Sequence, residues 1–219
     1  KNILTKIFSS KVDLSSKEIS FLEIIKKTKV SEIFKVISNY NDSSEIRYVG
    51  GCVRKILNNE KIDDIDLATN LKPNEVKECL QNNNIDFFET GIEHGTITAR
   101  LDEKNFEITS LRKDILTDGR HAKVEFTNEW TEDASRRDFT FNSIYADKEG
   151  NLFDPNDGVK DLENGKIQFI GDPEKRVKED YLRILRYVRF FLNYSRQEHN
   201  LNVIKIIKQN INGIVKLSK

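Results

Sequence analysis

The sequence has no methionine and no long apolar run, and it contains only two cysteines and three prolines in 219 residues. Without about 18 consecutive apolar residues, no membrane-spanning segment is expected. Cys52 and Cys79 lie 27 positions apart and the three histidines are scattered, so neither a disulfide framework nor a zinc site is predicted. We expect a reduced, cytoplasmic setting. The lack of methionine leads us to expect a segment of a longer protein.

An excess of charge of one sign is also lacking, because 36 Lys and Arg balance 36 Asp and Glu. A neutral total argues at first against a nucleic-acid partner. The charge is unevenly distributed, however: residues 166–219 hold 12 basic and 5 acidic residues, so that this part carries +7 and the rest −7. Because the N-terminal part is acidic and the C-terminal part is basic, a nucleic-acid partner is still compatible with the sequence.

Hydrophobic periodicity predicts an α+β chain, with a mixed sheet up to about residue 150 and a mostly helical part after it. Pro73 is expected to begin a helix, because proline suits the first turn. The predicted helices cover 15–40, 53–57, a segment from 73 on, and most of 173–215, and the predicted strands cover 46–49, 64–67, 97–101 and 106–111.

Two aspartates in a short alternating segment are the first candidates for chemistry. If 64–67 is a strand, Asp64 and Asp66 share one face while Ile65 and Leu67 face the core. Such a D-x-D pair also arises by chance in acidic chains. Glu107 alternates with apolar neighbours in the same way, so three carboxylates could share a face and hold two Mg²⁺ ions.

A glycine pair lies between the first predicted strand and a helix. Gly50 and Gly51 would let backbone N–H groups approach a phosphate, and Arg54 could add a charged contact. A glycine pair alone is usually a turn, and no Walker-type loop is present. This pair is a candidate because of its position: it lies 14 residues before Asp64, in the same predicted strand–turn–helix–strand unit.

The segment 136–142 contains two arginines, an aspartate and an asparagine. A solvated charge cluster is the simpler interpretation of such a run. Beside a metal site, however, the guanidinium groups of Arg136 and Arg137 would suit a triphosphate, and Asp138 and Asn142 could bond a ribose hydroxyl.

The helical part offers a second candidate, the pair Asp180 and Arg183. As surface decoration, Glu179 and Arg183 form an i,i+4 pair worth only about 0.2–0.5 kcal/mol. In a functional interpretation, Asp180 and Arg183 present an acceptor beside donors. That pattern matches the exocyclic amine and ring acceptor shared by cytosine and adenine.

Together these motifs resemble the class II tRNA nucleotidyltransferases (CCA-adding enzymes), which group with bacterial poly(A) polymerases in the polymerase-β-like superfamily. The resemblance covers roughly residues 45–195. The motifs that carry it are Gly-Gly-Cys-Val-Arg (50–54), Asp-Ile-Asp-Leu-Ala-Thr (64–69), Phe-Glu-Ile-Thr-Ser-Leu-Arg (106–112), Arg-Arg-Asp-Phe-Thr-Phe-Asn (136–142), Asp154-Pro155, Gly158, Asp161-Leu162, and the 179–190 segment. One departure is Lys55, where the family usually has Asp.

The resemblance implies a nucleotidyltransferase head with a mixed five-stranded sheet, followed by an all-α neck. The expected domains are an N-terminal helical segment (1–44), the catalytic head (45–148) and the nucleotide-selecting neck (149–219). By carry-over, Asp64 and Asp66 bind Mg²⁺ and Glu107 is the third catalytic carboxylate. The implied nucleotide-binding residues are Gly51, Arg54, Arg137, Asp138, Asn142, Asp180, Arg183, Arg186 and Arg189.

The implied activity is template-independent, Mg²⁺-dependent addition of CMP and AMP from CTP and ATP to the 3′ end of tRNA. The alternatives on the same scaffold are a poly(A) polymerase and an enzyme that adds only CC or only A. A catalytically inactive RNA-binding module is a further alternative, against which the full carboxylate set argues. No membrane partner is expected, and the sequence predicts no particular protein partner.

Overall fold

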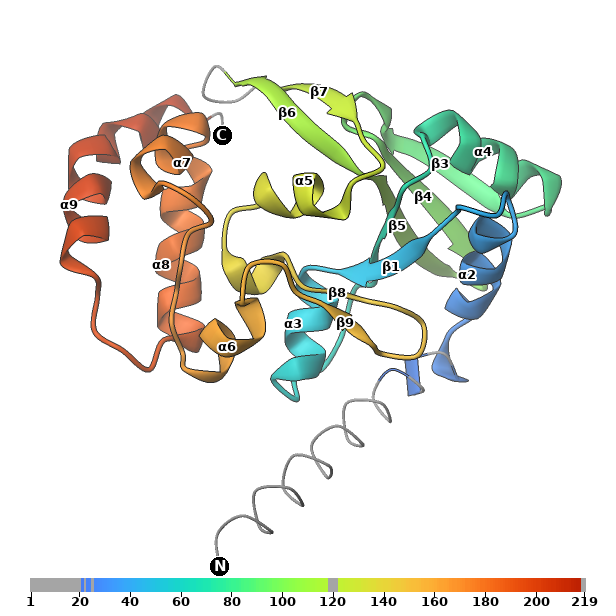
Figure 1. Cartoon of the computed structure of the whole chain (residues 1–219), viewed down its shortest axis with the longest axis horizontal. Helices are drawn as coiled ribbons and strands as arrows, with labels where there is room; N and C mark the ends of the chain where they lie inside the picture. Colours follow the sequence, from blue (N-terminus) through green and yellow to red (C-terminus); the bar gives the residue numbers. More distant parts are fainter. Residues whose placement is uncertain (1–20, 22, 25, 118–121, 218–219) are drawn as a thin grey trace, which may run out of the picture. The chain divides into compact units, whose positions relative to one another are not determined.

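The computed structural model describes residues 21, 23–24, 26–117 and 122–217 (Figure 1). They form two compact units. The first contains the described residues up to Ser110 together with Tyr145–Phe153, and the second contains Leu111–Ile144 and the described residues from Asp154 on. The domain bounds expected from the sequence divide the chain differently, and that functional division stays a prediction.

Seven strands of the described residues form the sheet of the first unit, in the order β3-β4-β5-β2-β1-β8-β9. The pair β2·β5 is parallel and the other pairs are antiparallel, so the mixed sheet of the α+β prediction is confirmed. The sheet exceeds the expected five strands partly because β8 and β9 have two residues each, too short for alternation to appear in the sequence. The strands are β1 (Ile46–Val49), β2 (Asp66–Thr69), β3 (Asp86–Gly91), β4 (Thr96–Leu101), β5 (Lys104–Ser110), β8 (Tyr145–Ala146) and β9 (Leu152–Phe153).

Helices α2 (Val30–Ser38), α3 (Gly51–Leu57) and α4 (Pro73–Asn82) accompany this sheet in the described part of the unit, as do the helical residues between 21 and 27. The apolar positions of α2 pack on β1, where the rings of Phe34 and Tyr48 lie 4.8 Å apart. Helix α4 begins at Pro73 as predicted, and the Glu75 side chain accepts a hydrogen bond from the Lys72 backbone N–H at 2.7 Å. This capping satisfies one of the backbone donors that a helix start leaves open.

The predicted single helix over 15–40 is interrupted. Residues 15–20 lie outside the described part; the described residues between 21 and 27 are helical, and α2 begins only at Val30. At the break the Thr28 hydroxyl donates to the Ile24 carbonyl at 2.8 Å and accepts from the Val30 backbone N–H at 3.3 Å. Such local side-chain bonds compete with helix continuation.

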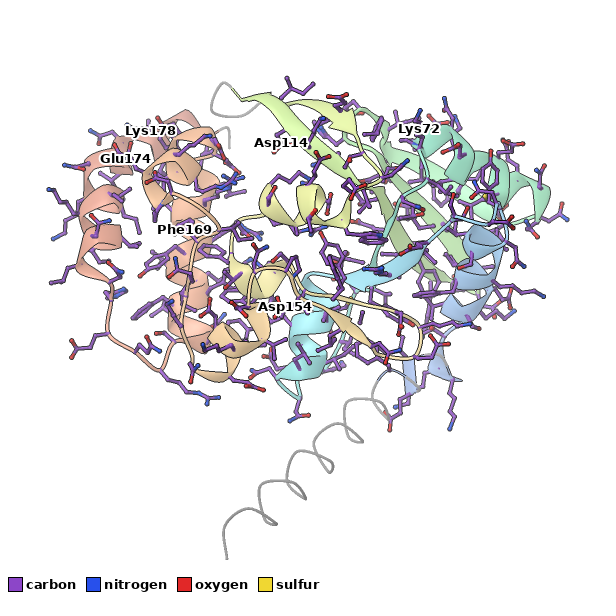
Figure 2. All side chains as sticks on the ribbon, in the orientation of Figure 1. Lys72, Asp114, Asp154, Phe169, Glu174 and Lys178 are labelled. Carbon is purple, nitrogen blue, oxygen red and sulfur yellow. The ribbon has the colours of Figure 1, made fainter. Side chains whose placement is uncertain are left out.

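The second unit combines a hairpin with helices around an aromatic core. Phe139 is fully buried, with its ring 4.6 Å from that of Phe169 and 5.4 Å from that of Phe190 (Phe169 is labelled in Figure 2). Aromatic pairs at these separations add to the free energy of simple burial. The elements are β6 (Arg112–Thr117), β7 (Ala122–Phe126), α5 (Trp130–Ser135), α6 (Gly158–Glu163), α7 (Pro173–Glu179), α8 (Leu182–Tyr194) and α9 (Leu201–Asn210), with 3₁₀ turns at Thr140–Asn142 and Ile211–Lys216.

Candidate active site

The parallel pair β2·β5 places two carboxylates opposite each other. Asp66 is the register partner of Glu107, and partners in adjacent strands about 4.8 Å apart share a face of the sheet. Their neighbours Leu67 and Ile108 are fully buried, whereas Asp66 is half-buried and Glu107 is exposed. Glu107 thus shares the face of Asp66, as its alternation predicted. Two opposed carboxylates repel each other, so this pair favours a cation between them.

Asp64 lies in the connection before β2, because the strand begins at Asp66. The prediction that 64–67 forms one strand is therefore wrong for its first half. The physical reason is pairing: the ladder with β5 begins at Asp66, and the ladder with β1 reaches only Leu67. Asp64 is exposed on the segment that leads directly into the carboxylate face.

The glycine pair forms the start of α3. Gly50 has φ 67°, a left-handed conformation that favours glycine, and Gly51 is the first helical residue. A Cβ built at Gly51 would lie 3.7 Å from Asp66 Oδ2 and 3.9 Å from Arg54 Nη2. The start of α3, the Asp66 carboxylate and the buried Arg54 guanidinium therefore converge on one small volume.

Lys55, the departure from the family pattern, is directed to another residue of the same unit. Its Nζ donates to Asp63 Oδ2 at 2.9 Å, and this hydrogen bond raises the pKa of Lys55. Asp63 directly precedes Asp64 in the chain. The lysine thus pairs with the connection that carries Asp64, while Arg54 stays buried at the start of the helix.

The residues present fit a divalent cation shared with substrate, rather than a closed protein cage. Within the described ranges, no group of three or more Asp, Glu, His or Cys side chains is close enough to hold a metal ion. Mg²⁺ commonly takes one or two protein carboxylates and completes its shell with water and substrate phosphates. The opposed Asp66 and Glu107 supply that donor chemistry.

In the second unit, Asp133 organises the arginine pair, and the sequence interpretation missed it. Its side chain is 1% exposed and pairs with Arg136 at 2.7 Å and with Arg137 at 2.9 Å. The available signal was spacing, because Asp133 precedes the two arginines by three and four residues on a helical segment. Arg137 therefore lies in a buried ion-pair cluster rather than in a solvated charge run.

Asp138 and Asn142 lie together, as their shared role implied. Asp138 Oδ1 accepts from Asn142 Nδ2 at 3.0 Å and from the Phe139 backbone N–H at 2.9 Å, and Arg186 Nε donates to Oδ2. Burial raises the pKa of Asp138, but the charge and hydrogen bond of Arg186, with the other donors, outweigh it and hold the pKa below its usual value. Asp138 is thus an ionised, buried acceptor.

Asp180 and Arg183 do not share one uninterrupted helix, which corrects the prediction for 173–215. Helix α7 ends at Glu179, Asp180 is extended with φ −155°, and α8 begins at Leu182. Asp180 Oδ1 accepts from the Leu182 backbone N–H at 2.9 Å, a local side-chain bond that holds the turn at the break between α7 and α8. Arg183 forms an ion pair with the half-buried Glu179 at 2.7 Å, so this pair is more than surface decoration.

Arg189 is exposed on α8, with its guanidinium carbon 4.9 Å from the centre of the Phe190 ring. Arg186 contacts the same ring at 5.4 Å, so the two arginines flank one aromatic side chain. The predicted site residues thus fall into two groups. The first unit contains Gly51, Arg54, Asp64, Asp66 and Glu107, and the second contains Arg137, Asp138, Asn142, Asp180, Arg183, Arg186 and Arg189.

Comparison with known sequences gives one family match and several curated relatives. The family described as the poly A polymerase head domain matches residues 46–168. The chain is 47% identical over 180 residues to the human mitochondrial CCA tRNA nucleotidyltransferase 1, which covers 81% of this chain and 42% of that protein. It is 40% identical over 168 residues to the CCA-adding enzyme of Oceanobacillus iheyensis, covering 75% and 41%. The chain thus spans less than half the length of these relatives.

Solved structures agree with the sequence matches. The crystal structure of the Bacillus stearothermophilus CCA-adding enzyme in complex with CTP aligns with a TM-score of 0.73 at 31% identity, over 85% of this chain and 44% of that one. A tRNA nucleotidyltransferase complexed with a primer tRNA and an incoming ATP analogue aligns with a TM-score of 0.64 at 25% identity, over 82% and 50%. Across the part of the chain that the structure describes, no helix is long and apolar enough to span a bilayer.

Proposed function

Because the chain belongs to the poly A polymerase head family, the family of the class II tRNA nucleotidyltransferases, we propose that it is the nucleotide-transferring part of a CCA-adding enzyme. The reaction adds CMP and AMP from CTP and ATP to the 3′ end of tRNA. The observation that carries the proposal is the register of Asp66 with Glu107, with the start of α3 within contact distance of the same carboxylate. This combination supports catalysis rather than a binding module alone.

The chemistry requires transfer of one nucleotidyl group. The 3′-hydroxyl oxygen of the RNA bonds to the α-phosphorus, the bond to the bridging oxygen breaks, pyrophosphate leaves, and the hydroxyl proton passes to solvent. Bound Mg²⁺ supplies positive charge at the hydroxyl and at the phosphates. Asp66 and Glu107 would hold it, with Asp64 contributing from the adjoining connection. Gly51 allows close approach of phosphate, and the Arg54 charge stabilises it.

Selection of the base falls to the second group of residues. Asp180 and Arg183 together offer an acceptor beside donors, which suits cytosine and adenine. Glu179 holds Arg183 by an ion pair at 2.7 Å, and Arg183 Nη1 also donates to the Arg176 carbonyl at 2.9 Å. These contacts orient the guanidinium before a base arrives. Asp138 and Asn142 present an ionised acceptor and an amide for the ribose, with Arg186 and Arg189 supporting that part.

A poly(A) polymerase is the second candidate, favoured by the description of the matching family. Feeding nucleotides separately tells the two apart. The protein is incubated with Mg²⁺ and a tRNA that ends before CCA, in the presence of CTP, ATP or both. We expect two additions with CTP, a third only when ATP is also present, and no long tail with ATP alone. A long A-tail identifies the rival, and addition of only CC or only A identifies a split enzyme.

The metal-site assignment is tested by Asp66→Asn and Glu107→Gln, with Asp86→Asn as the matched control. Asp86 is an exposed aspartate at the start of β3, in the same unit but separated from β2 by the strands β4 and β5. We expect each site variant to lose about a hundredfold or more in kcat, as for loss of a single preorganised electrostatic group, and the control to stay within about twofold. Full activity of Asp66→Asn refutes the assignment.

A cytoplasmic location also remains part of the proposal. It is supported by Cys52 and Cys79, which are both buried thiols with no disulfide. The name of the human relative assigns that protein to mitochondria. Imaging of the tagged protein in its own cells distinguishes a cytoplasmic from an organellar location.

A further inference from the structure

Asp133 is the centre of a buried polar cluster in the second unit. Its carboxylate accepts from Arg136 Nε and Nη2 at 3.1 and 2.7 Å, and from Arg137 Nε and Nη2 at 3.1 and 2.9 Å. The Arg112 backbone N–H also donates to Oδ1, at 3.2 Å. Five donors from three residues therefore converge on one carboxylate that is 1% exposed.

These contacts fix the direction of both guanidinium groups. Each arginine presents its Nε–Nη2 edge to Asp133, so the opposite edge, with Nη1, is directed away from the carboxylate. Arg136 Nε also donates to the Arg112 carbonyl at 3.0 Å, which adds a further anchor. A guanidinium held along one edge loses little further conformational freedom when its other edge binds an anion.

Arg112 lies among groups of both charges. Arg136 and Arg137 repel its guanidinium, and Asp114 and Asp133 attract it (Asp114 is labelled in Figure 2). Burial, followed by repulsion from Arg136, lowers the pKa of Arg112 to about 10. An anion bound beside the cluster relieves that repulsion.

The same cluster is linked to the helices that carry the proposed base-selecting pair. Arg176 Nη2 donates to the Ser135 carbonyl at 2.6 Å, and Arg183 Nη2 donates to the Arg136 carbonyl at 3.4 Å. The end of α5 and the junction of α7 with α8 are therefore held together within the second unit.

We propose that Asp133 is a positioning residue, which holds Arg136 and Arg137 so that their outer edges bind the triphosphate of the incoming nucleotide. The inference rests on the proposed function, since it assumes a nucleoside triphosphate as ligand. Asp133 itself does not touch the nucleotide. It acts through the two arginines, so its loss weakens binding of the phosphate chain rather than binding of the base.

The test compares ligands that differ only in phosphate. Binding of CTP and of CMP is measured by calorimetry, with Mg²⁺, for the wild type, for Asp133→Asn and for the control Asp161→Asn. Asp161 is a buried carboxylate of the same unit, to which the Thr140 hydroxyl donates at 2.8 Å. We expect Asp133→Asn to weaken CTP binding about tenfold or more and CMP binding less than threefold, while Asp161→Asn leaves the ratio of the two affinities unchanged. Equal weakening of CTP and CMP overturns the proposal.

A second variant separates positioning from folding. Arg137→Lys keeps the charge but removes the two-point contact with Asp133, at a side chain that is 18% exposed. We expect it to shift the ratio of CTP to CMP affinity in the same direction. An unchanged ratio in this variant refutes positioning, whether or not Asp133→Asn folds.

Two parallel titrations separate failure of the triphosphate assignment from failure of the proposed function. The first uses a tRNA acceptor-stem RNA, and selective loss of RNA affinity in Asp133→Asn shows that the arginines bind the RNA backbone, which overturns the triphosphate assignment. The second uses CTP and ATP. If the wild type binds CTP but Asp133→Asn binds it equally well, only the role of Asp133 is refuted. If the wild type binds neither CTP nor ATP, the proposed function fails with it.

Discussion

Substitution of Gly51 by alanine separates the stability of the first unit from its activity. The new Cβ would lie 3.7 Å from Asp66 Oδ2 and 3.9 Å from Arg54 Nη2, which are ordinary van der Waals separations. Gly51 is also the first residue of α3 and lacks the left-handed φ of Gly50. The folded chain therefore accepts the methyl group without strain.

We expect the Gly51→Ala substitution to raise the stability of the fold but to lower the catalytic activity. Replacing a helical glycine by alanine lowers the conformational entropy of the unfolded chain, so we expect the free energy of unfolding to rise by about 0.4–1 kcal/mol. A phosphate oxygen that accepts from the Gly51 backbone N–H must come within about 3 Å of the nitrogen. The methyl group occupies that approach, so we expect kcat/KM for CTP to fall about tenfold or more, equivalent to about 1.4 kcal/mol.

The assay measures urea unfolding and single-nucleotide addition on the same preparations. Gly91→Ala is the matched control, because its Cβ would also meet its nearest neighbour, the Thr96 Cβ, at 3.7 Å, and β3 is separated from β2 by two strands. Its activity should remain within about twofold of the wild type. Wild-type kinetics in Gly51→Ala would refute the assignment of this backbone to the nucleotide.

Three further predictions concern the interior. Gly158→Ala should lower the free energy of unfolding, measured by urea titration, by about 2 kcal/mol or more. The reason is that a Cβ at residue 158 would overlap the Thr140 carbonyl group, whose carbon would lie only 2.6 Å away. An unfolding free energy equal to that of the wild type contradicts this packing. Cys52 should resist alkylation at pH 8 in the native protein, since burial raises the pKa of its thiol to about 12, and rapid labelling measured by mass spectrometry argues against this burial. Because the pKa of Asp138 is lowered in the folded state by Arg186 and its other donors, its ionised form stabilises the fold above the unfolded pKa of about 3.9, and that stability is lost as pH falls through the folded value. Asp138→Asn should therefore be less stable than the wild type at pH 7 and converge with it in acid; a constant difference in unfolding free energy across this range contradicts the ionised pair.

The local sequence pattern predicted the structure correctly where the residues of a single helix or strand determine it. The alternation around Glu107 predicted its exposed face between buried neighbours, and Pro73 marked the start of α4. The same kind of reasoning failed at Asp64 and at Asp180, because periodicity cannot show where a ladder partner ends or where a side chain bonds to the backbone in a turn between two helices.

The sequence by itself determined the α+β class, the ordered motifs of the family, and the kinds of side chain available for metal, phosphate and base. Only the tertiary structure decided which of them meet. Asp66 faces Glu107, 41 positions later in the chain, because β2 and β5 pair in one register, and a shift by one residue would turn Glu107 to the opposite face. Asp133 shows both sides: its spacing of three and four residues from Arg136 and Arg137 is present in the sequence, but only the tertiary structure buries its carboxylate and adds the Arg112 backbone N–H as a donor.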